Sequence, residues 1–236
     1  MDLVSSFSVT KKHVHQSSVS NWLVGGWHLF KTAPVKLTVV MLSLFVIEGV
    51  IQIIPGPTGM LLSKWVASSI VIALWPLMDN LAKSGKFHLS ALKKYSGWRK
   101  AAMLAVILAS PFLLQVFTAF LLMGQPGLDL ILFAEAQIVP PIFVSLVLIS
   151  AIPLVMLLQF SPAKLLIDKQ SVFQSLVQSV RMVIKAWRPM MVLALVNVLL
   201  IGLAPYTFAL SFIFFGPWLC CVNYQAYRAL TAQEAK

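Results

Sequence analysis

The sequence carries very little charge, and almost none of that charge is acidic. Of its 236 residues only 11% are charged, with 7 Asp and Glu against 18 Lys and Arg, whereas 59% are hydrophobic. A soluble domain has about 25% charged residues with which to cover its surface. The composition therefore excludes a folded domain in water, and the length allows about five to seven membrane spans of roughly 20 residues each.

Motifs that carry chemistry are also missing. The sequence contains no phosphate-binding G-x-x-x-x-G-K-[ST], no H-E-x-x-H, no G-x-S-x-G and no C-x-x-C. The two cysteines are the neighbours Cys220 and Cys221, which are poorly placed to form an unstrained disulfide with each other. His13 and His15 have no Cys, Asp or Glu nearby to complete a metal site. We therefore expect no enzyme, no metal and no cofactor.

Runs without Asp, Glu, Lys or Arg locate the membrane spans. Such runs cover 101–128, 136–163 and 189–227; the last is too long for one crossing, and the glycine and proline at 202–205 divide it into a hairpin. The prolines at 55 and 57 divide the apolar front of the chain in the same way. The chain is thus predicted to be all-α, a polytopic membrane protein with six transmembrane helices near 34–54, 61–78, 101–123, 138–160, 189–203 and 206–222.

The basic residues predict the orientation of these helices. Every Lys and Arg except Lys36 and Lys64 falls before the first helix, after the last, or in the second or fourth connection between helices, and the three other connections have none. Cytoplasmic loops of membrane proteins carry such an excess of Lys and Arg. We therefore expect both termini in the cytoplasm, no nucleic-acid partner, and one integral membrane domain over 1–236 with hairpins at about 34–78, 101–160 and 189–222 after a mobile N-terminal arm, 1–17.

The cytoplasmic segments have the spacing of amphipathic helices. Apolar residues recur at helical intervals over 19–30 and 165–187, and over a shorter stretch at 90–99. A proline follows Ser161, which predicts a helix start there. Helices with one cationic and one apolar face lie in the lipid headgroup layer and attract anionic lipid. The expected lipid contacts are Lys93, Lys94, Arg99, Lys100, Arg181, Lys185 and Arg188.

Part of the chain resembles a known family. The resemblance is carried by the segment NWLVGGWHLFK at 21–31 with Pro34 after it, by IP at 54–55 with Gly59, and by SAL at 90–92. These features are similar to those of an uncharacterised family of bacterial inner-membrane proteins, multi-pass and of unknown function. The resemblance is strongest over roughly 20–100. It implies a bacterial cytoplasmic membrane and supplies no catalytic residue.

Four long polar side chains lie inside the predicted spans, and they leave two functions open. Glu48 is the one acidic residue within a span, Gln52 lies one turn further along the same helix face, and Gln115 and Asn197 lie in other spans. One interpretation is a solute, proton or cation site in a small transporter or channel. The other is a carboxyl group that holds helices together by hydrogen bonds. We favour the second, and with it a non-enzymatic membrane partner, scaffold or lipid-interacting module, which could also bind another membrane protein.

Overall fold

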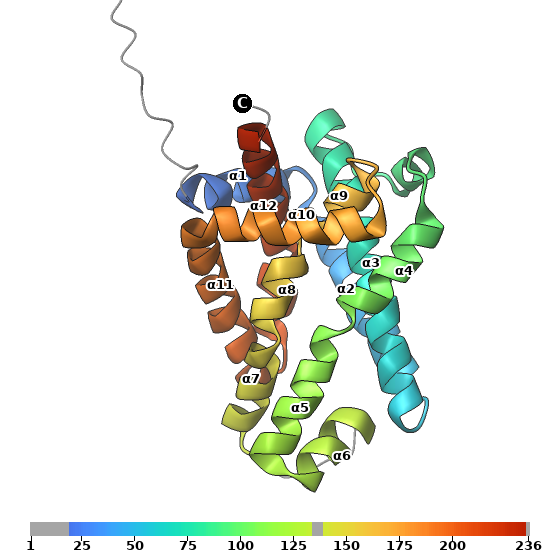
Figure 1. The fold of residues 1–236 in the computed structure, drawn as a ribbon, viewed down its shortest axis with the longest axis vertical. Helices are drawn as coiled ribbons and strands as arrows, with labels where there is room; N and C mark the ends of the chain where they lie inside the picture. Colours follow the sequence, from blue (N-terminus) through green and yellow to red (C-terminus); the bar gives the residue numbers. More distant parts are fainter. Residues whose placement is uncertain (1–18, 134–138, 235–236) are drawn as a thin grey trace, which may run out of the picture.

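The structure, a computed structural model, describes residues 19–133 and 139–234, and throughout these residues the only regular elements are helices (Figure 1). The predicted N-terminal arm, His13, His15 and Glu135 lie outside the described residues. The helices in chain order are α1 (Val19–Thr32), α2 (Pro34–Gln52), α3 (Pro57–Ser84), η1 (Leu89–Lys94), α4 (Trp98–Leu108), α5 (Pro111–Met123), α6 (Gln125–Phe133), α7 (Pro141–Ser150), α8 (Ile152–Leu158), α9 (Ser161–Leu166), α10 (Val172–Lys185), α11 (Trp187–Gly202), η2 (Ala204–Tyr206) and α12 (Leu210–Glu234).

Five helical stretches are long and apolar enough to cross a membrane. They are Pro34–Gln52, Pro57–Ser84, Trp98–Met123, Pro141–Leu166 and Trp187–Tyr206. The all-α class predicted from the sequence is thereby confirmed, and the five long apolar helices are compatible with a membrane protein. The sixth expected span, 206–222, falls in η2 and the first half of α12, where the polar side chains of Asn223 and Gln225 soon follow the apolar run. α12 is therefore not among the helices that are both long and apolar enough to cross a membrane.

Prolines interrupt the two middle spans. The helix expected over 101–123 is divided into α4 and α5 just before Pro111, and α7 gives way to α8 at Ala151, two residues before Pro153. A proline has no N–H to donate to the preceding turn, and its ring crowds the carbonyl four residues back, so each break has a local cause. The segment expected as a simple outer connection holds a further short helix, α6, which packs against α5.

Two helices run across one end of the bundle instead of along it. In Figure 1, α1 and α10 lie nearly at right angles to α5, α8 and α11. The apolar periodicity predicted both. A helix does start at Ser161, as predicted, but it is the short α9 and not α10. The Ser161 side chain does not cap it, since its hydroxyl donates to the Leu158 carbonyl at 2.6 Å. The chain then turns at Lys169, with φ +56°, and Ser171 caps α10 in a capping box with Gln174.

The short amphipathic stretch expected over 90–99 is not one helix. It divides into the 3₁₀ turn η1 and the first turn of α4, with Gly97 between them at φ +97°. That backbone conformation suits glycine and ends a right-handed helix. The break lets Tyr95 turn toward α3, where its hydroxyl reaches Asp79. The three amphipathic segments therefore do not have the same structure.

Helix α12 rises through the middle of the same end and packs against α1. A Cβ added at Gly26 of α1 would lie 2.8 Å from the Val222 backbone, so only glycine permits this approach. Trp22 and Val222 are buried at the contact, and the Trp218 indole donates to the Leu23 carbonyl at 3.3 Å. Small residues at helix contacts let membrane helices come close together. The contact fixes α1 across the end of the bundle.

Candidate functional site

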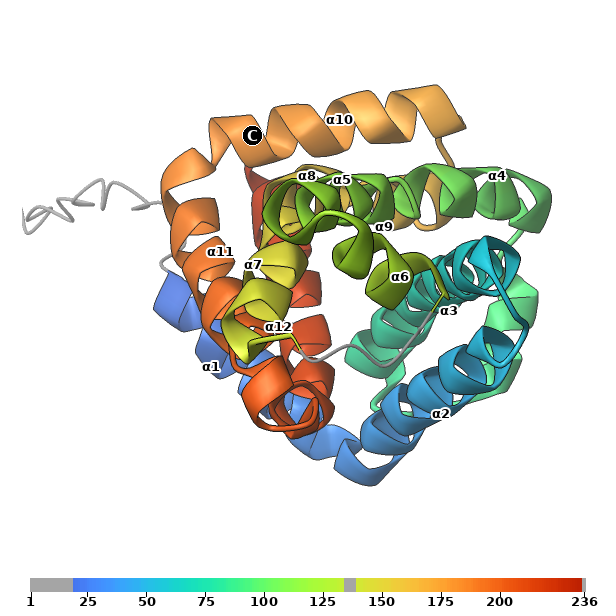
Figure 2. The same cartoon turned by 90° about the horizontal axis from the view of Figure 1, so that it is seen from below.

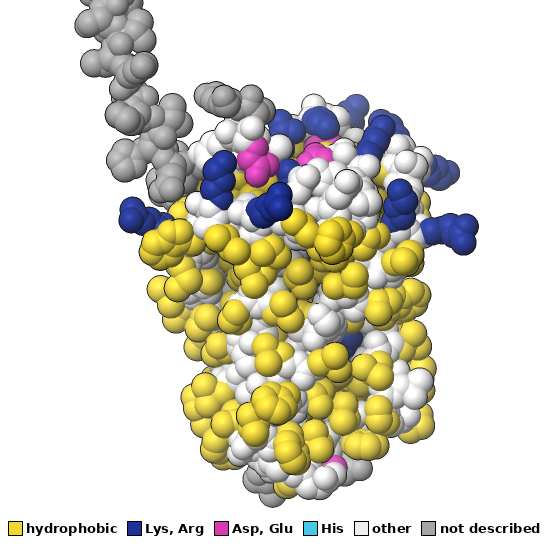
Figure 3. Space-filling view, in the orientation of Figure 1, with side chains coloured by type: hydrophobic (Ala, Val, Ile, Leu, Met, Phe, Trp, Pro, Cys, Tyr) yellow, Lys and Arg dark blue, Asp and Glu magenta, His cyan; other side chains and the backbone are white. Residues whose placement is uncertain are grey.

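The exposed cations gather at one end of the molecule. Figure 3 shows Lys and Arg crowded at the end where α1 and α10 lie, above a broad apolar surface. We call this end the basic end; it comprises α1, the C-terminal turns of α3, η1, the start of α4, α9, α10, the start of α11 and the C-terminal half of α12. It carries all seven side chains that the sequence predicts to contact anionic lipid, and each of them is exposed: Lys93, Lys94, Arg99, Lys100, Arg181, Lys185 and Arg188.

None of these seven cations has a carboxylate within 4 Å in the described part of the chain. The described acidic side chains that form ion pairs are held by other cations, namely Lys64, Lys83, Lys164 and Arg228. Over the residues that the structure describes, no ion pair therefore neutralises the charge of the seven. Arg188 lies over the Trp187 ring at 5.5 Å, which leaves its charge in place.

One face of α10 is built to pack against the protein. Ser175, Ser179, Met182 and Val183 are buried on it. The Ser179 hydroxyl donates to the Leu157 carbonyl at 2.7 Å and accepts from the Phe160 amide at 3.1 Å. A small polar residue thus satisfies backbone groups where α8 ends, and it lets α10 lie close to the bundle.

The remaining surface of α10 is divided between a polar and an apolar face. Phe173 and Ile184 share one side of α10 at helical spacing and are 75% and 61% exposed. Trp187, at the start of α11, is 58% exposed. Arg181 and Lys185 are exposed on another side. At about 100° per residue, the buried, apolar and cationic directions lie roughly a third of a turn apart. Figure 2 shows that α10 runs along the outer edge of the bundle, so its apolar face has no helix beside it.

Beneath these cations, the buried carboxylate of Asp79 joins three elements. Asp79 is 1% exposed near the end of α3. It accepts hydrogen bonds from Lys83 at 2.7 Å, from the Tyr95 hydroxyl at 2.8 Å and from the Tyr224 hydroxyl at 2.9 Å, and Arg228 lies 3.9 Å away. Burial, and then the hydrogen bond to Asp79, raise the pKa of Tyr95 well above its usual range. Tyr95 therefore remains a hydrogen-bond donor, and the carboxylate ties η1 and α12 to α3.

A second ion pair, in which the lysine is buried, lies just before the turn that leads into α10. The Lys164 side chain is 4% exposed, and its ammonium lies 3.2 Å from Asp168 and 3.3 Å from Glu234. It also lies over the Tyr227 ring at 5.7 Å, and the Tyr227 hydroxyl donates to Asp168 at 2.7 Å. An ammonium buried in this way is stable only when paired and hydrogen-bonded. The C-terminal turns of α12 are thereby fastened to the turn between α9 and α10.

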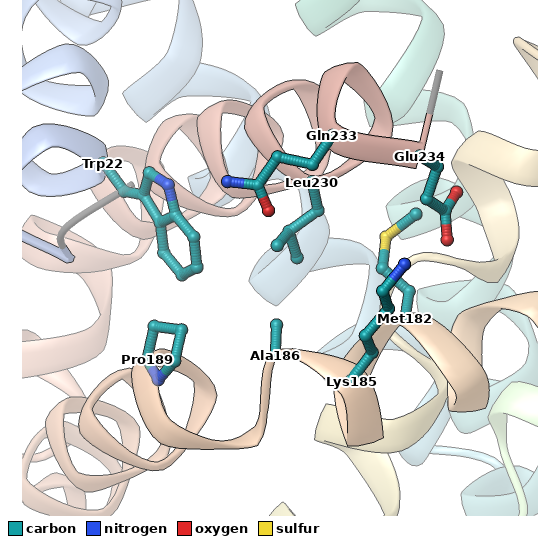
Figure 4. A pocket seen from close by; sticks show the side chains of 8 residues that line it. All are labelled: Trp22, Met182, Lys185, Ala186, Pro189, Leu230, Gln233 and Glu234. Atoms are coloured by element: carbon teal, nitrogen blue, oxygen red, sulfur yellow. The ribbon is translucent and has the colours of Figure 1, made fainter. Parts of the chain in front are cut away.

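A small pocket lies among α1, α12 and the junction of α10 with α11 (Figure 4). Its volume is about 100 Å³, and it is lined by Trp22, Met182, Lys185, Ala186, Pro189, Leu230, Gln233 and Glu234. Ligand pockets usually measure about 300–1,000 Å³. This pocket is too small for a cofactor, and we assign it no ligand.

The polar side chains expected inside the membrane are brought together only in part. Glu48 forms an ion pair with Lys64 across the α2–α3 hairpin, and the Gln52 amide donates to the Ser63 hydroxyl at 3.3 Å. Asn197 donates to the Leu193 carbonyl of its own helix at 2.8 Å. No hydrogen bond joins Gln115 to the other three within the described residues. The sequence analysis did not identify Lys64 as the partner of Glu48.

Asp79 was missed by sequence reasoning, although the sequence contains a signal for it. Acidic residues are so few in this chain that each one near the end of a span needs a partner, and Lys83 lies one turn further along the same helix. The tyrosines could not be predicted, since Tyr95 and Tyr224 reach Asp79 only through the tertiary fold. Over the described residues, no cluster of His, Cys, Asp or Glu has the arrangement of a metal site.

Comparison with family models, with curated proteins and with solved structures gives no match to this chain. The functional argument therefore starts from the geometry of the basic end.

We predict that Asp79→Asn destabilises the protein. The substitution leaves Lys83 and Arg228 without their counter-charge and weakens two tyrosine hydrogen bonds, and a hydrogen bond to a charged group is worth about 1.5–3 kcal/mol. Thermal unfolding in detergent should show a lower midpoint than the wild type. Asp129→Asn is the matched control, because Asp129 lies in α6 at the other end and, among the described residues, accepts a hydrogen bond only from Gln125. Equal midpoints for the two variants would contradict the role given to Asp79.

Proposed function

We propose that this chain is a bacterial inner-membrane protein with six spans and cytoplasmic termini, and that it acts without catalysis as a lipid-interacting module. Its basic end binds anionic lipid of the cytoplasmic leaflet. The observation that carries the proposal is the division of α10 into three faces. A helix at the rim of a membrane protein meets protein on one side, lipid on a second and water on a third, and the three directions on α10 match these surroundings.

The seven unpaired cations supply the electrostatic part of the proposal. Each Lys or Arg close to an anionic leaflet contributes about 1 kcal/mol to the attraction. A cation already paired with a carboxylate would contribute much less, because its field is cancelled nearby. The described carboxylates of the basic end pair with Lys83, Lys164 and Arg228, and none of them lies within 4 Å of the seven exposed cations.

The sixth span is the first half of α12. After η2 the chain turns back, and α12 packs along α2 and α11, two of the five long apolar helices. Its polar second half then rises at the basic end. The first half of α12 is then the sixth crossing and returns the chain to the side of the membrane on which it began. With six crossings, α1 and the C-terminal end of α12 lie on the same side, where they pack together.

Topology can be tested with reporter fusions. Alkaline phosphatase fused after Gly59, Gly127 or Pro205 should be active, because these positions face the outside in the six-span arrangement. Fusions after Lys94, Lys185 or Lys236 should be inactive, since the enzyme matures only outside the cytoplasm. Reversed activity at two of the six positions would overturn the proposed orientation.

Lipid binding can be tested by removing charge at the basic end. We expect Lys93, Lys94, Arg99 and Lys100, all replaced by Gln, to retain less phosphatidylglycerol in native mass spectrometry than the wild type. The control variant has Lys93, Lys94 and Lys100 replaced by Arg, which keeps the charge and should retain lipid as before. Equal retention by the Gln variant and the wild type would contradict the lipid-binding role.

The alternative of transport through Glu48 has a separate test. If the Glu48–Lys64 pair only holds α2 against α3, then Glu48→Gln should lower the thermal midpoint in detergent, because Lys64 is left as an unpaired charge. Glu48→Gln combined with Lys64→Gln removes both charges and should restore much of the loss. A Glu48→Gln protein that is as stable as the wild type but fails to complement a deletion strain would favour transport instead.

A further inference from the structure

A second cavity lies at the basic end, where two connections meet. It is formed by the junction of α1 with α2 and by the segment between α3 and η1, and its volume is about 260 Å³. We call it the corner cavity. The residues that line it are Thr32, Ala33, Pro34, Val35, Lys36, Gly85, Lys86, Phe87 and His88. Three of them are basic and none is acidic, so the chemistry of the lining favours an anion.

The segment that forms one wall of the corner cavity is held in a fixed conformation. Gly85 ends α3 at φ +66°, and its amide donates to the Leu81 carbonyl at 2.9 Å. The Asn80 side chain donates to the Lys86 carbonyl at 2.6 Å, and Phe87 is 6% exposed, anchored in the hydrophobic core. A wall that is already ordered loses little entropy when a ligand binds.

Lys36 joins this wall from the other side. Its ammonium lies 3.3 Å from the Phe87 carbonyl, which accepts a hydrogen bond from it. Lys86 and His88 precede and follow Phe87 in the chain. Together with Lys36, they place three basic residues next to Phe87, whose side chain is anchored in the core. An ammonium has three donors, and the carbonyl occupies one of them, which leaves donors for an anion. No carboxylate lies within 4 Å of Lys36 or Lys86 among the described residues.

An apolar path leads away from the corner cavity along α2. Val35, Val39 and Val46 are 72%, 52% and 63% exposed, and their spacing places them along one side of the helix. A phosphate group bound at Lys36 would therefore stand at the head of a surface suited to an acyl chain. A free phosphate ion would use the cations alone, whereas a phospholipid would use the cations and the valines.

We propose that the corner cavity is a discrete site for the phosphate headgroup of one anionic phospholipid, bound by Lys36, Lys86 and His88, with an acyl chain lying along α2. The site rests on the proposed function only in that the basic end must face the cytoplasmic leaflet. It does not use the seven exposed cations, which attract lipid by their field and not through a shaped cavity.

The experiment is a lipid titration of the full-length protein in detergent, followed by native mass spectrometry. Phosphatidylglycerol, phosphatidylcholine and inorganic phosphate are titrated separately. The wild type should retain one tightly bound phosphatidylglycerol in preference to phosphatidylcholine, with no comparable binding of inorganic phosphate. Lys36→Gln combined with Lys86→Gln should weaken that first binding step by about ten-fold or more, since two cations near the headgroup are lost.

Two control variants make the result decisive. Lys169→Gln removes an exposed charge that belongs neither to the cavity nor to the seven exposed cations, and it should leave the first binding step unchanged. Lys36→Arg combined with Lys86→Arg keeps the charge and should bind as the wild type does, which shows that the wall still folds. Equal weakening by the corner pair and by Lys169→Gln, or tight binding of inorganic phosphate alone, would overturn the discrete lipid site. If only the corner pair affects lipid binding, the site stands and the broader role of the seven exposed cations fails.

Discussion

The cost of placing charge in hydrocarbon governs the whole molecule. A charged side chain at the centre of a bilayer costs at least a few kcal/mol even by the most lenient scales. Within the five long apolar stretches, Glu48 and Lys64 lie well away from the basic end and are paired with each other. Nearly every other cation stands at the basic end. The described carboxylates there, the buried Asp79 and the exposed Asp168 and Glu234, pair with Lys83, Lys164 and Arg228. The other cations at that end have no carboxylate within 4 Å among the described residues.

Packing between helices is concentrated at the basic end. In the best windows of the five long apolar helices, only 17–33% of residues are buried within the protein. The largest buried side chains, by contrast, include Trp22, Tyr224, Tyr227 and Phe160, contributed by α1, α12 and the turn before α9. Trp75 packs edge-on against both Tyr227 and Phe160. The rest of the bundle presents apolar side chains to its surroundings, which suits lipid as the solvent.

The sequence predicts those features that depend on composition and period. Runs without charge located three of the five long apolar helices, and the prolines at 55 and 57 separated the other two. The apolar stripes at 19–30 and 165–187 predicted α1 and α10. Features that depend on one tertiary partner were not predictable. The contact of Tyr95 with Asp79 goes with the break at Gly97, and the late start of α10 follows from a turn at Lys169 that no local pattern marks. Among the candidate site residues, the seven cations are exposed. Their contact with lipid stays a prediction, and their lack of partners among the described residues required the structure.

Some cations form ion pairs with carboxylates of the described residues and others do not. This difference separates charges that stabilise the fold from charges to which we assign a function. A lysine such as Lys164 is buried beside two carboxylates and an aromatic ring, and its removal would leave Asp168 and Glu234 unbalanced. A lysine such as Lys93 is exposed and has no carboxylate within 4 Å among the described residues, so its charge forms no ion pair there. Such cations are grouped on one side of α10 and at the start of α4, at the level where α1 and α10 cross the bundle. In the function that we propose, their charge acts outside the protein, on the headgroup layer, which would be the anionic surface nearest to a helix in that position.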